Sequence, residues 1–196
     1  MNRVEKIAHR GASGYALENS PEAFRKAIEL GVNYLEADVQ LTADNIPVVI
    51  HDKLLDRTSN GKGYVWEHTW DQLCSTVKLN NGENIWSLRE LAQFVFDTNS
   101  KLYVDLKSFD AEKMVLDIIS SVLTTTQFII GSFHYPTLKN IKLLNSEITT
   151  VMIIEGNPID IERIVENTQC DIVAFGFDSI APDSVQRVHN LGKKVF

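Results

Sequence analysis

The feature that most constrains the fold is a regular alternation of short extended segments with amphipathic helical segments along the chain. This alternation is typical of parallel βαβ units, because neighbouring parallel strands need a long crossover, which a helix usually supplies. The sequence therefore predicts an α/β fold built on a parallel sheet. The predicted strands are residues 4–8, 33–39, 101–106, 128–133, 148–154 and 171–175, and the predicted helices are residues 21–30, 87–95, 111–123, 136–144, 158–168 and 182–191.

Six complete strands and the beginning of another, at residues 193–196, fit two architectures. One is a TIM-type (β/α)₈ barrel that stops before its eighth strand, and the other is an open doubly wound sheet. The strand count does not distinguish them. The alternation is interrupted from residue 41 to residue 85, where an apolar run at residues 47–50 precedes a turn-rich segment at residues 58–63. A connection of this length usually carries function or forms a subdomain.

Composition limits the class of protein. The chain has 196 residues, of which 44% are apolar and 23% charged, as expected for one globular domain over residues 1–196. A net charge of −7 argues against nucleic-acid binding, which requires a basic surface. No apolar run approaches the roughly 18 residues that a membrane span needs, and Cys74 and Cys170 form no disulfide or metal-binding pattern. We therefore expect a cytoplasmic protein with no stable membrane insertion.

A pair of carboxylates lies within the second predicted strand. Glu36 and Asp38 are two residues apart, so both side chains project from one face near the carboxyl end of the strand, where barrel active sites lie. Two like charges in this position need a cation. Taken alone, however, such a pair on a strand is most often a solvated edge or part of a salt bridge.

Ionisable residues also end the neighbouring segments. His9 and Arg10 follow the first predicted strand, His51 follows the apolar run of the interruption, and Asp105 and Lys107 end the third strand. Because the carboxyl ends of barrel strands meet at one rim, we expect these side chains to gather there. Once a barrel is granted, an accidental grouping is much the weaker explanation.

The predicted rim suits phosphodiester cleavage. Carboxylate oxygens from Glu36, Asp38 and Asp105, without Cys or clustered His, favour Mg²⁺ or Ca²⁺ over zinc. Such a metal offsets the negative charge that develops on the phosphoryl group.

The remaining rim residues supply proton transfer and positive charge. His9 and His51 can divide the general-base and general-acid work, because an imidazole ordinarily exchanges its proton near neutral pH. Arg10 offers a planar fork for phosphate oxygens, and Lys107 offers a point charge. The other histidines, at positions 68, 134 and 189, stand apart from carboxylate clusters, and we expect them on the surface or at helix caps.

Several sequence blocks, in order and at matching separations, resemble the signature of the glycerophosphodiester phosphodiesterase family. The strongest blocks are residues 9–14, 18–20, 36–44, 48–52 and 56–63. Weaker blocks are residues 86–91, 105–107, 131–133 and 192–196. The resemblance therefore spans essentially the whole chain.

The resemblance implies a (β/α)₈ barrel with a small insertion after the second strand, at about residues 46–86. It also implies hydrolysis of small-molecule glycerophosphodiesters to sn-glycerol 3-phosphate and an alcohol, with a bound divalent metal. By motif match, the acid/base residues are His9 and His51, the metal ligands are Glu36, Asp38 and Asp105, and the substrate-binding residues are Arg10, Lys107 and Glu18. Two alternatives stay open: phospholipase D-like or lyase activity on larger lipid phosphodiesters, and phosphodiester binding without turnover.

Three departures from the family pattern matter. Leu17 stands where the family usually has Pro, which frees the backbone of that loop. Asp105 stands where the family usually has Glu, and the shorter side chain must draw the strand inward or bind a metal through water. The family continues beyond Phe196 to an eighth strand, so we expect a barrel truncated before strand 8. Its open edges invite pairing with another chain, as in a homodimer.

Overall fold

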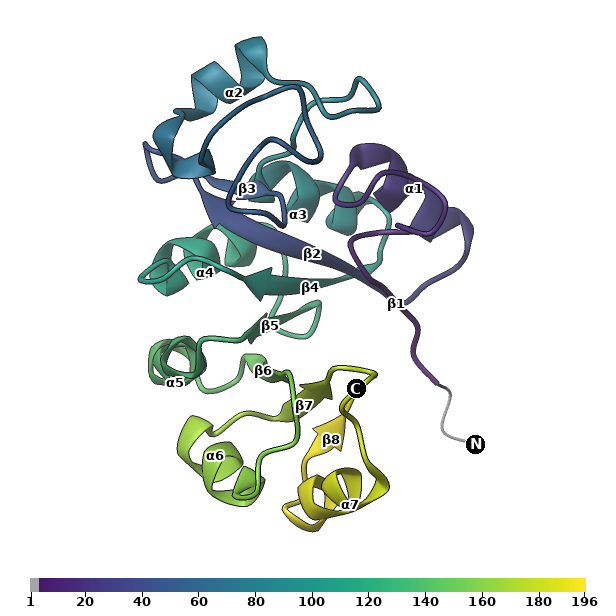
Figure 1. The fold of residues 1–196 in the computed structure, drawn as a ribbon, viewed down its shortest axis with the longest axis vertical. Coiled ribbons are helices and arrows are strands. Elements are labelled where there is room, and N and C mark those ends of the chain that lie inside the picture. Colours follow the sequence, from purple (N-terminus) through teal and green to yellow (C-terminus); the bar gives the residue numbers. More distant parts are fainter. Residues whose placement is uncertain (1–3) are drawn as a thin grey trace.

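An eight-stranded sheet in the order β1-β2-β4-β5-β6-β7-β8, with β3 paired to β2, forms the centre of residues 4–196, which are the residues that this computed structural model describes (Figure 1). All pairings are parallel except that of β2 with β3. The strands are β1 (Ile7–Ala8), β2 (Tyr34–Leu41), β3 (Pro47–Val49), β4 (Lys101–Leu106), β5 (Phe128–Ser132), β6 (Thr149–Ile154), β7 (Ile172–Phe175) and β8 (Lys194–Val195). The helices are α1 (Pro21–Glu29), the 3₁₀ helix η1 (Val65–Glu67), α2 (Trp70–Thr76), α3 (Leu88–Asp97), α4 (Glu112–Ser120), α5 (Tyr135–Leu144), α6 (Ile161–Thr168) and α7 (Pro182–Asn190).

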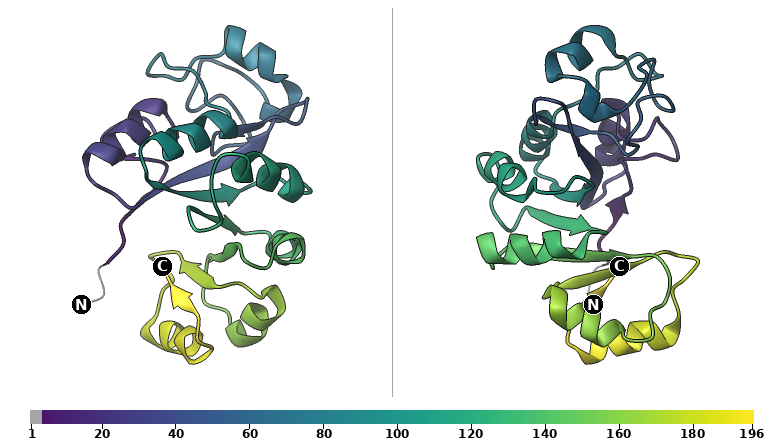
Figure 2. Two further views of the ribbon diagram at one scale, coloured as in Figure 1. Left: turned by 180° about the vertical axis from the view of Figure 1, so that it is seen from behind. Right: turned by 60° about the vertical axis from the view of Figure 1, so that its left-hand side comes forward.

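The parallel strands follow one another in chain order, which decides between the two predicted architectures. A doubly wound sheet reverses its strand order at a switch point, whereas a barrel sheet does not. The sheet curls into an arc whose two edges are β1 and β8, and α3, α4 and α5 lie side by side on its outer face (Figures 1 and 2). The prediction of a TIM-type barrel sheet is confirmed, in the form of an unclosed arc over the described residues.

Cap signals in the sequence explain where several helices begin. The Ser20 hydroxyl accepts a hydrogen bond from the Ala23 backbone N–H at 3.1 Å, and Pro21 occupies the first turn of α1. Three predicted boundaries were wrong by three residues, and one of them is the end of α4, which lies at Ser120 and not at residue 123. The first strand is only two residues long, because pairing with β2 begins at Ile7. The helix expected from residue 158 begins at Ile161, after a turn that carries the chain away from β6.

Apolar side chains fill both sides of the sheet. The larger cluster lies between the sheet and its outer helices and includes the fully buried Phe24, Leu91 and Leu102. A second cluster occupies the concave side, and its members are Tyr34, Tyr103, Ile129, Val151 and Ile172. Gly131 on β5 makes room for this cluster, because a Cβ there would lie 2.7 Å from the Tyr103 ring. Among the described residues, no helix is long and apolar enough to cross a membrane.

The interruption between β2 and α3 folds around its own small core. Its buried apolar residues are Val48, Ile50, Leu55, Val65, Leu73, Val77, Leu79 and Ile85. No helix was expected here, but α2 is present and begins with a capping box in which Thr69 and Gln72 bond reciprocally. An ion pair between Arg25 of α1 and Glu83 fastens this segment to the rest of the molecule.

Candidate active site

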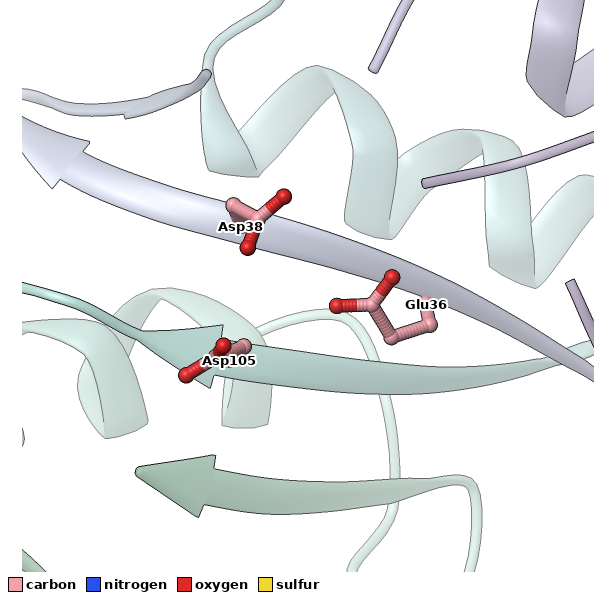
Figure 3. Close-up of side chains that lie close together, drawn as sticks. All are labelled: Glu36, Asp38 and Asp105. Atoms are coloured by element: carbon pink, nitrogen blue, oxygen red, sulfur yellow. The ribbon is translucent and has the colours of Figure 1, made fainter. Parts of the chain in front are cut away.

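Three buried carboxylates converge at the carboxyl end of the sheet. Glu36 and Asp38 lie on β2, and Asp105 lies on β4 directly opposite Asp38 in the strand register. Figure 3 shows the three side chains on the same side of the two strands. One ligand atom from each lies within 4.8 Å of the others, so a single ion could contact all three. The structure thus brings together the predicted metal ligands.

The charges of this cluster are unfavourable without a cation. Burial, and then repulsion from Asp38, raise the pKa of Glu36 to about 8. Burial also raises the pKa of Asp105 to about 6, although the Lys107 ammonium opposes this shift. Like charges in a site poor in water are costly, and a bound divalent ion would favour their ionised forms.

The donor set fits a hard divalent metal. Asp105 Oδ1 is buried and has no hydrogen-bond partner within the described part of the chain, so one coordinating lone pair is left uncommitted. The candidate donors are all carboxylate oxygens, the type that Mg²⁺ and Ca²⁺ prefer. The residues therefore fit the metal that the sequence predicts.

A strained loop after β1 places Arg10 beside the carboxylates. Arg10 and Gly11 have φ angles of 56° and 73°, which direct the Arg10 backbone N–H to Glu36 Oε2 at 2.5 Å. Gly11 is required here for a second reason, since a Cβ would lie 2.8 Å from Ala23. The Arg10 guanidinium lies 3.2 Å from Asp38 Oδ2.

His9 precedes this loop and stays exposed at the rim. Partial loss of water around the imidazole, and then the nearby Arg10 guanidinium, lower the pKa of His9 from its usual value. A neutral imidazole can accept a proton, which is the property that a general base needs.

Lys107 lies between two cavities at the rim. Its ammonium pairs with Asp38 Oδ1 at 3.1 Å and with Asp105, and it lies 4.9 Å from the centre of the Phe133 ring. One cavity of about 500 Å³ extends from Lys107 to His51, and another of about 260 Å³ extends from Lys107 to Phe133. A phosphate held at Lys107 would therefore have space on both sides.

His51 follows β3 and faces the larger cavity. Its Nδ1 lies 2.7 Å from Asp52 Oδ1, and its backbone carbonyl accepts a hydrogen bond from the Gln40 side chain at 2.9 Å. The contact with Asp52 orients the ring and leaves Nε2 free of it. Asp52 itself stays ionised over a wide range, because hydrogen bonding from Arg57 lowers the pKa of Asp52 to about 2.

Glu18 also lies at the rim, but its oxygens are engaged by protein groups. It contacts Arg57 at 2.6 and 2.9 Å and Arg10 at 3.0 Å, and the Arg57 contact is the main reason why the pKa of Glu18 is lowered. Its predicted contact with the substrate stays a prediction.

Three residues that support this site had no role predicted from the sequence. Asn19 donates to Asp38 Oδ2 at 2.8 Å from a backbone φ of 54°, and Asp52 and Arg57 hold His51 as described above. All three lie inside the blocks that carry the family resemblance, which was the available signal. The contacts of Asn19 with Asp38 and of Arg57 with Glu18, however, join segments that are 19 and 39 residues apart.

The fold and the rim cluster first define a class, that of (β/α)-barrel enzymes whose chemistry lies at the carboxyl ends of the strands. Within this class, the model of the Glycerophosphoryl diester phosphodiesterase family matches residues 9–196. The chain belongs to this family of phosphodiester hydrolases.

Similar proteins and a similar solved structure agree with this assignment. A glycerophosphodiester phosphodiesterase of Caldanaerobacter subterraneus subsp. tengcongensis is 29% identical over 97% of this chain and 83% of that protein. A glycerophosphodiester phosphodiesterase of Bacillus subtilis is 29% identical over 79% of this chain and 61% of that protein. The solved structure of an Oleispira antarctica phosphodiesterase in complex with the product sn-glycerol-3-phosphate is similar with a TM-score of 0.91 and 25% identity, covering 98% of this chain and 83% of that one.

Proposed function

We propose that this protein hydrolyses glycerophosphodiesters to sn-glycerol 3-phosphate and an alcohol, with the help of a divalent metal. The observation that carries the proposal is the convergence of three buried carboxylates with two cations and two histidines at one rim. The similar Oleispira antarctica phosphodiesterase, solved with sn-glycerol-3-phosphate, supports the choice of product.

Glu36, Asp38 and Asp105 would hold Mg²⁺ or Ca²⁺. When bound, such an ion offsets negative charge on the phosphoryl oxygens during cleavage. Arg10 and Lys107 already stand beside the same carboxylates, so they can bind the remaining phosphate oxygens without moving to a new place.

The two histidines divide the proton transfers. One accepts a proton from the attacking oxygen, and the other gives a proton to the leaving alkoxide. The lowered pKa of His9 suits the accepting role. His51, oriented by Asp52 on its Nδ1 side, suits the donating role at Nε2. The attacking oxygen belongs either to water or to a neighbouring hydroxyl of the substrate, and the second route passes through a cyclic phosphate.

Release of sn-glycerol 3-phosphate from glycerophosphocholine tests the proposal. We expect activity with Mg²⁺ or Ca²⁺, its loss in EDTA, and its return when the metal is restored. Activity that is indifferent to EDTA would contradict the metal role. Calorimetric binding of glycerophosphocholine with no product after long incubation would favour a binding protein instead.

A second candidate substrate is a lysophospholipid, cleaved as by a phospholipase D. It is favoured by the smaller cavity, whose lining includes Phe109 and Phe133 next to Lys107. Faster turnover of lysophosphatidylcholine than of glycerophosphocholine, with co-sedimentation of the protein with liposomes, would rank it first.

Two further properties are proposed from the rest of the molecule. We propose a cytoplasmic location because both Cys74 and Cys170 are free thiols. We propose a homodimer because the sheet edges β1 and β8 are not paired with each other within residues 4–196. Light scattering coupled to size-exclusion chromatography tests the second, and a monomer of 22.1 kDa would contradict it.

A further inference from the structure

A continuous string of contacting charged side chains runs along the rim to His51 from Arg10, a proposed phosphate-binding residue. It begins at Arg10, whose guanidinium contacts Glu18 at 3.0 Å. Glu18 contacts Arg57, Arg57 contacts Asp52, and Asp52 contacts His51 Nδ1 at 2.7 Å. The string crosses from the loop after β1 to the loop after β3, two segments that are distant in sequence.

Arg57 lies at the centre of this string and donates hydrogen bonds to a carboxylate on each side. Its NH1 and NH2 atoms lie 2.9 and 2.6 Å from the two oxygens of Glu18. Its Nε and NH2 atoms lie 2.6 and 3.0 Å from the two oxygens of Asp52. A guanidinium held by two paired contacts on each side is fixed in orientation as well as position, which a single point charge would not achieve.

The orientation of Arg57 is transmitted to the His51 ring. Arg57 occupies both oxygens of Asp52, so the carboxylate is locked in the plane from which it meets His51 Nδ1. A carboxylate in this place fixes the tautomer with hydrogen on Nδ1 and directs Nε2 elsewhere. The free edge of the ring then faces the cavity that it shares with Lys107.

We propose that Arg57 is a positioning residue, which sets the tautomer and orientation of His51 through Asp52 and ties them through Glu18 to the phosphate-side Arg10. The kinetic consequence of this role rests on the proposed function. Arg57 does not touch the reacting atoms or the substrate, and it acts only by orienting His51. Its removal should therefore slow the chemical step, which needs His51, and leave binding of the substrate in place.

A simpler explanation is that Arg57 only fastens the loop after β3 to the loop after β1. The molecule contains a matched control for this explanation. Arg25 of α1 contacts Glu83, so it also fastens the segment between β2 and α3 to the first βα unit, but it has no link to His51. A purely mechanical role would make the two arginines equivalent.

The kinetic test compares Arg57→Gln, Arg57→Lys and Arg25→Gln with the unaltered protein on glycerophosphocholine. For Arg57→Gln we expect kcat to fall about 10- to 100-fold, the usual effect of losing a group that orients a functional histidine, with KM unchanged. Arg57→Lys keeps the charge but not the fork, and should lie in between. Arg25→Gln should keep kcat. An equal loss in Arg25→Gln, or a rise in KM alone for Arg57→Gln, overturns the proposal.

A measurement independent of activity uses ¹⁵N-labelled histidine. Long-range ¹H–¹⁵N correlation spectra report which ring nitrogen carries the proton, and His51→Gln assigns the signal. We expect His51 to be protonated on Nδ1 in the unaltered protein and to lose this preference in Arg57→Gln. If Arg57→Gln fails to fold, Arg57→Lys and Asp52→Asn take its place, with the same expectation. An unchanged tautomer overturns the proposal, even if the protein proves not to hydrolyse glycerophosphodiesters.

Discussion

The two halves of the sheet differ more in chemistry than in backbone. In the first half, β2 and β4 carry the buried Glu36, Asp38 and Asp105, and β1 leads into Arg10. In the second half, from β5 onward, every buried polar side chain of the described residues is a Ser or Thr hydroxyl. Apart from the segment between β2 and α3, parallel strands and helices alternate in both halves, so the fold alone does not dictate where a barrel places its charges.

The difference separates buried charged groups from ordinary apolar packing within one sheet. Buried carboxylates oppose folding unless they are paired, and in the first half Arg10 and Lys107 pair with Asp38 and Lys107 also pairs with Asp105, while Glu36 accepts only the Arg10 backbone N–H. The second half buries an ordinary apolar cluster that includes Leu138, Met152 and Val173. We therefore expect changes in the first half to affect turnover and changes in the second half to affect stability.

The largest expected effect follows from removing a carboxylate of the cluster. Asp38→Asn removes a proposed metal ligand and the partner of both cations, so hydrolysis of glycerophosphocholine should fall roughly 10³-fold or more. Asp178→Asn makes the same chemical change at an exposed position after β7 and should leave activity intact. A similar loss of hydrolysis in both variants would contradict the expectation that only the first half of the sheet determines turnover.

A histidine pair gives the next comparison. His51→Ala should lower kcat by roughly 10²–10⁴-fold, the usual worth of a positioned acid or base. His134 also follows a strand end, but its Nδ1 contacts Thr137 at the start of α5, so His134→Ala should leave kcat unchanged. Steady-state rates measure both. A large loss only in His134→Ala would move the acid/base site into the second half.

The second half should respond in stability rather than turnover. Leu138 is fully buried on α5, and Leu138→Ala should lower the free energy of unfolding by about 2–5 kcal/mol. Leu143 on the same helix is 77% exposed, and Leu143→Ala should change it by less than about 0.5 kcal/mol. Urea denaturation measures both values. The kcat of the folded Leu138→Ala protein should be unchanged, and a fall would show that this half also shapes the active site.

The smallest effect concerns acid stability at the junction of the two loops. Hydrogen bonding from Arg57 lowers the pKa of Asp52 to about 2, so ionised Asp52 stabilises the fold above its unfolded pKa of about 3.9. This contribution is lost as the pH falls from that value towards 2. The melting temperature of Asp52→Asn should therefore be lower than that of the unaltered protein at pH 5, and this difference should disappear near pH 2. A difference that stays constant would contradict the assignment.

The fold was predictable from sequence where local signals and the global arrangement agree. Apolar runs located β4 to β7, and the Ser20-Pro21 start located α1. Alternation alone fits two architectures, and only the family resemblance indicated the barrel, which the strand order confirms. Helix α2 escaped prediction although its capping box is visible in the sequence, since the surrounding turn residues outweighed a helix of seven residues.

The charged residues of the candidate site could be predicted from the sequence. The residues that hold them in place could not. Glu36 and Asp38 are found by the period of the strand, and Asp105 by its place at the end of the next parallel strand. The supports depend on contacts that no local pattern specifies. Asn19 reaches Asp38 only from a left-handed backbone, and Arg57 meets Glu18 across 39 residues.

The most direct test of the account is to locate the metal and the product in a crystal grown with Mn²⁺ and sn-glycerol 3-phosphate. Anomalous scattering at the manganese edge should give a peak about 2.0–2.6 Å from oxygens of Glu36, Asp38 and Asp105. The phosphate should lie beside Arg10 and Lys107. A manganese peak elsewhere, or none at saturating Mn²⁺ with the phosphate bound away from this rim, would contradict a metal-assisted phosphodiesterase site in the first half of the sheet.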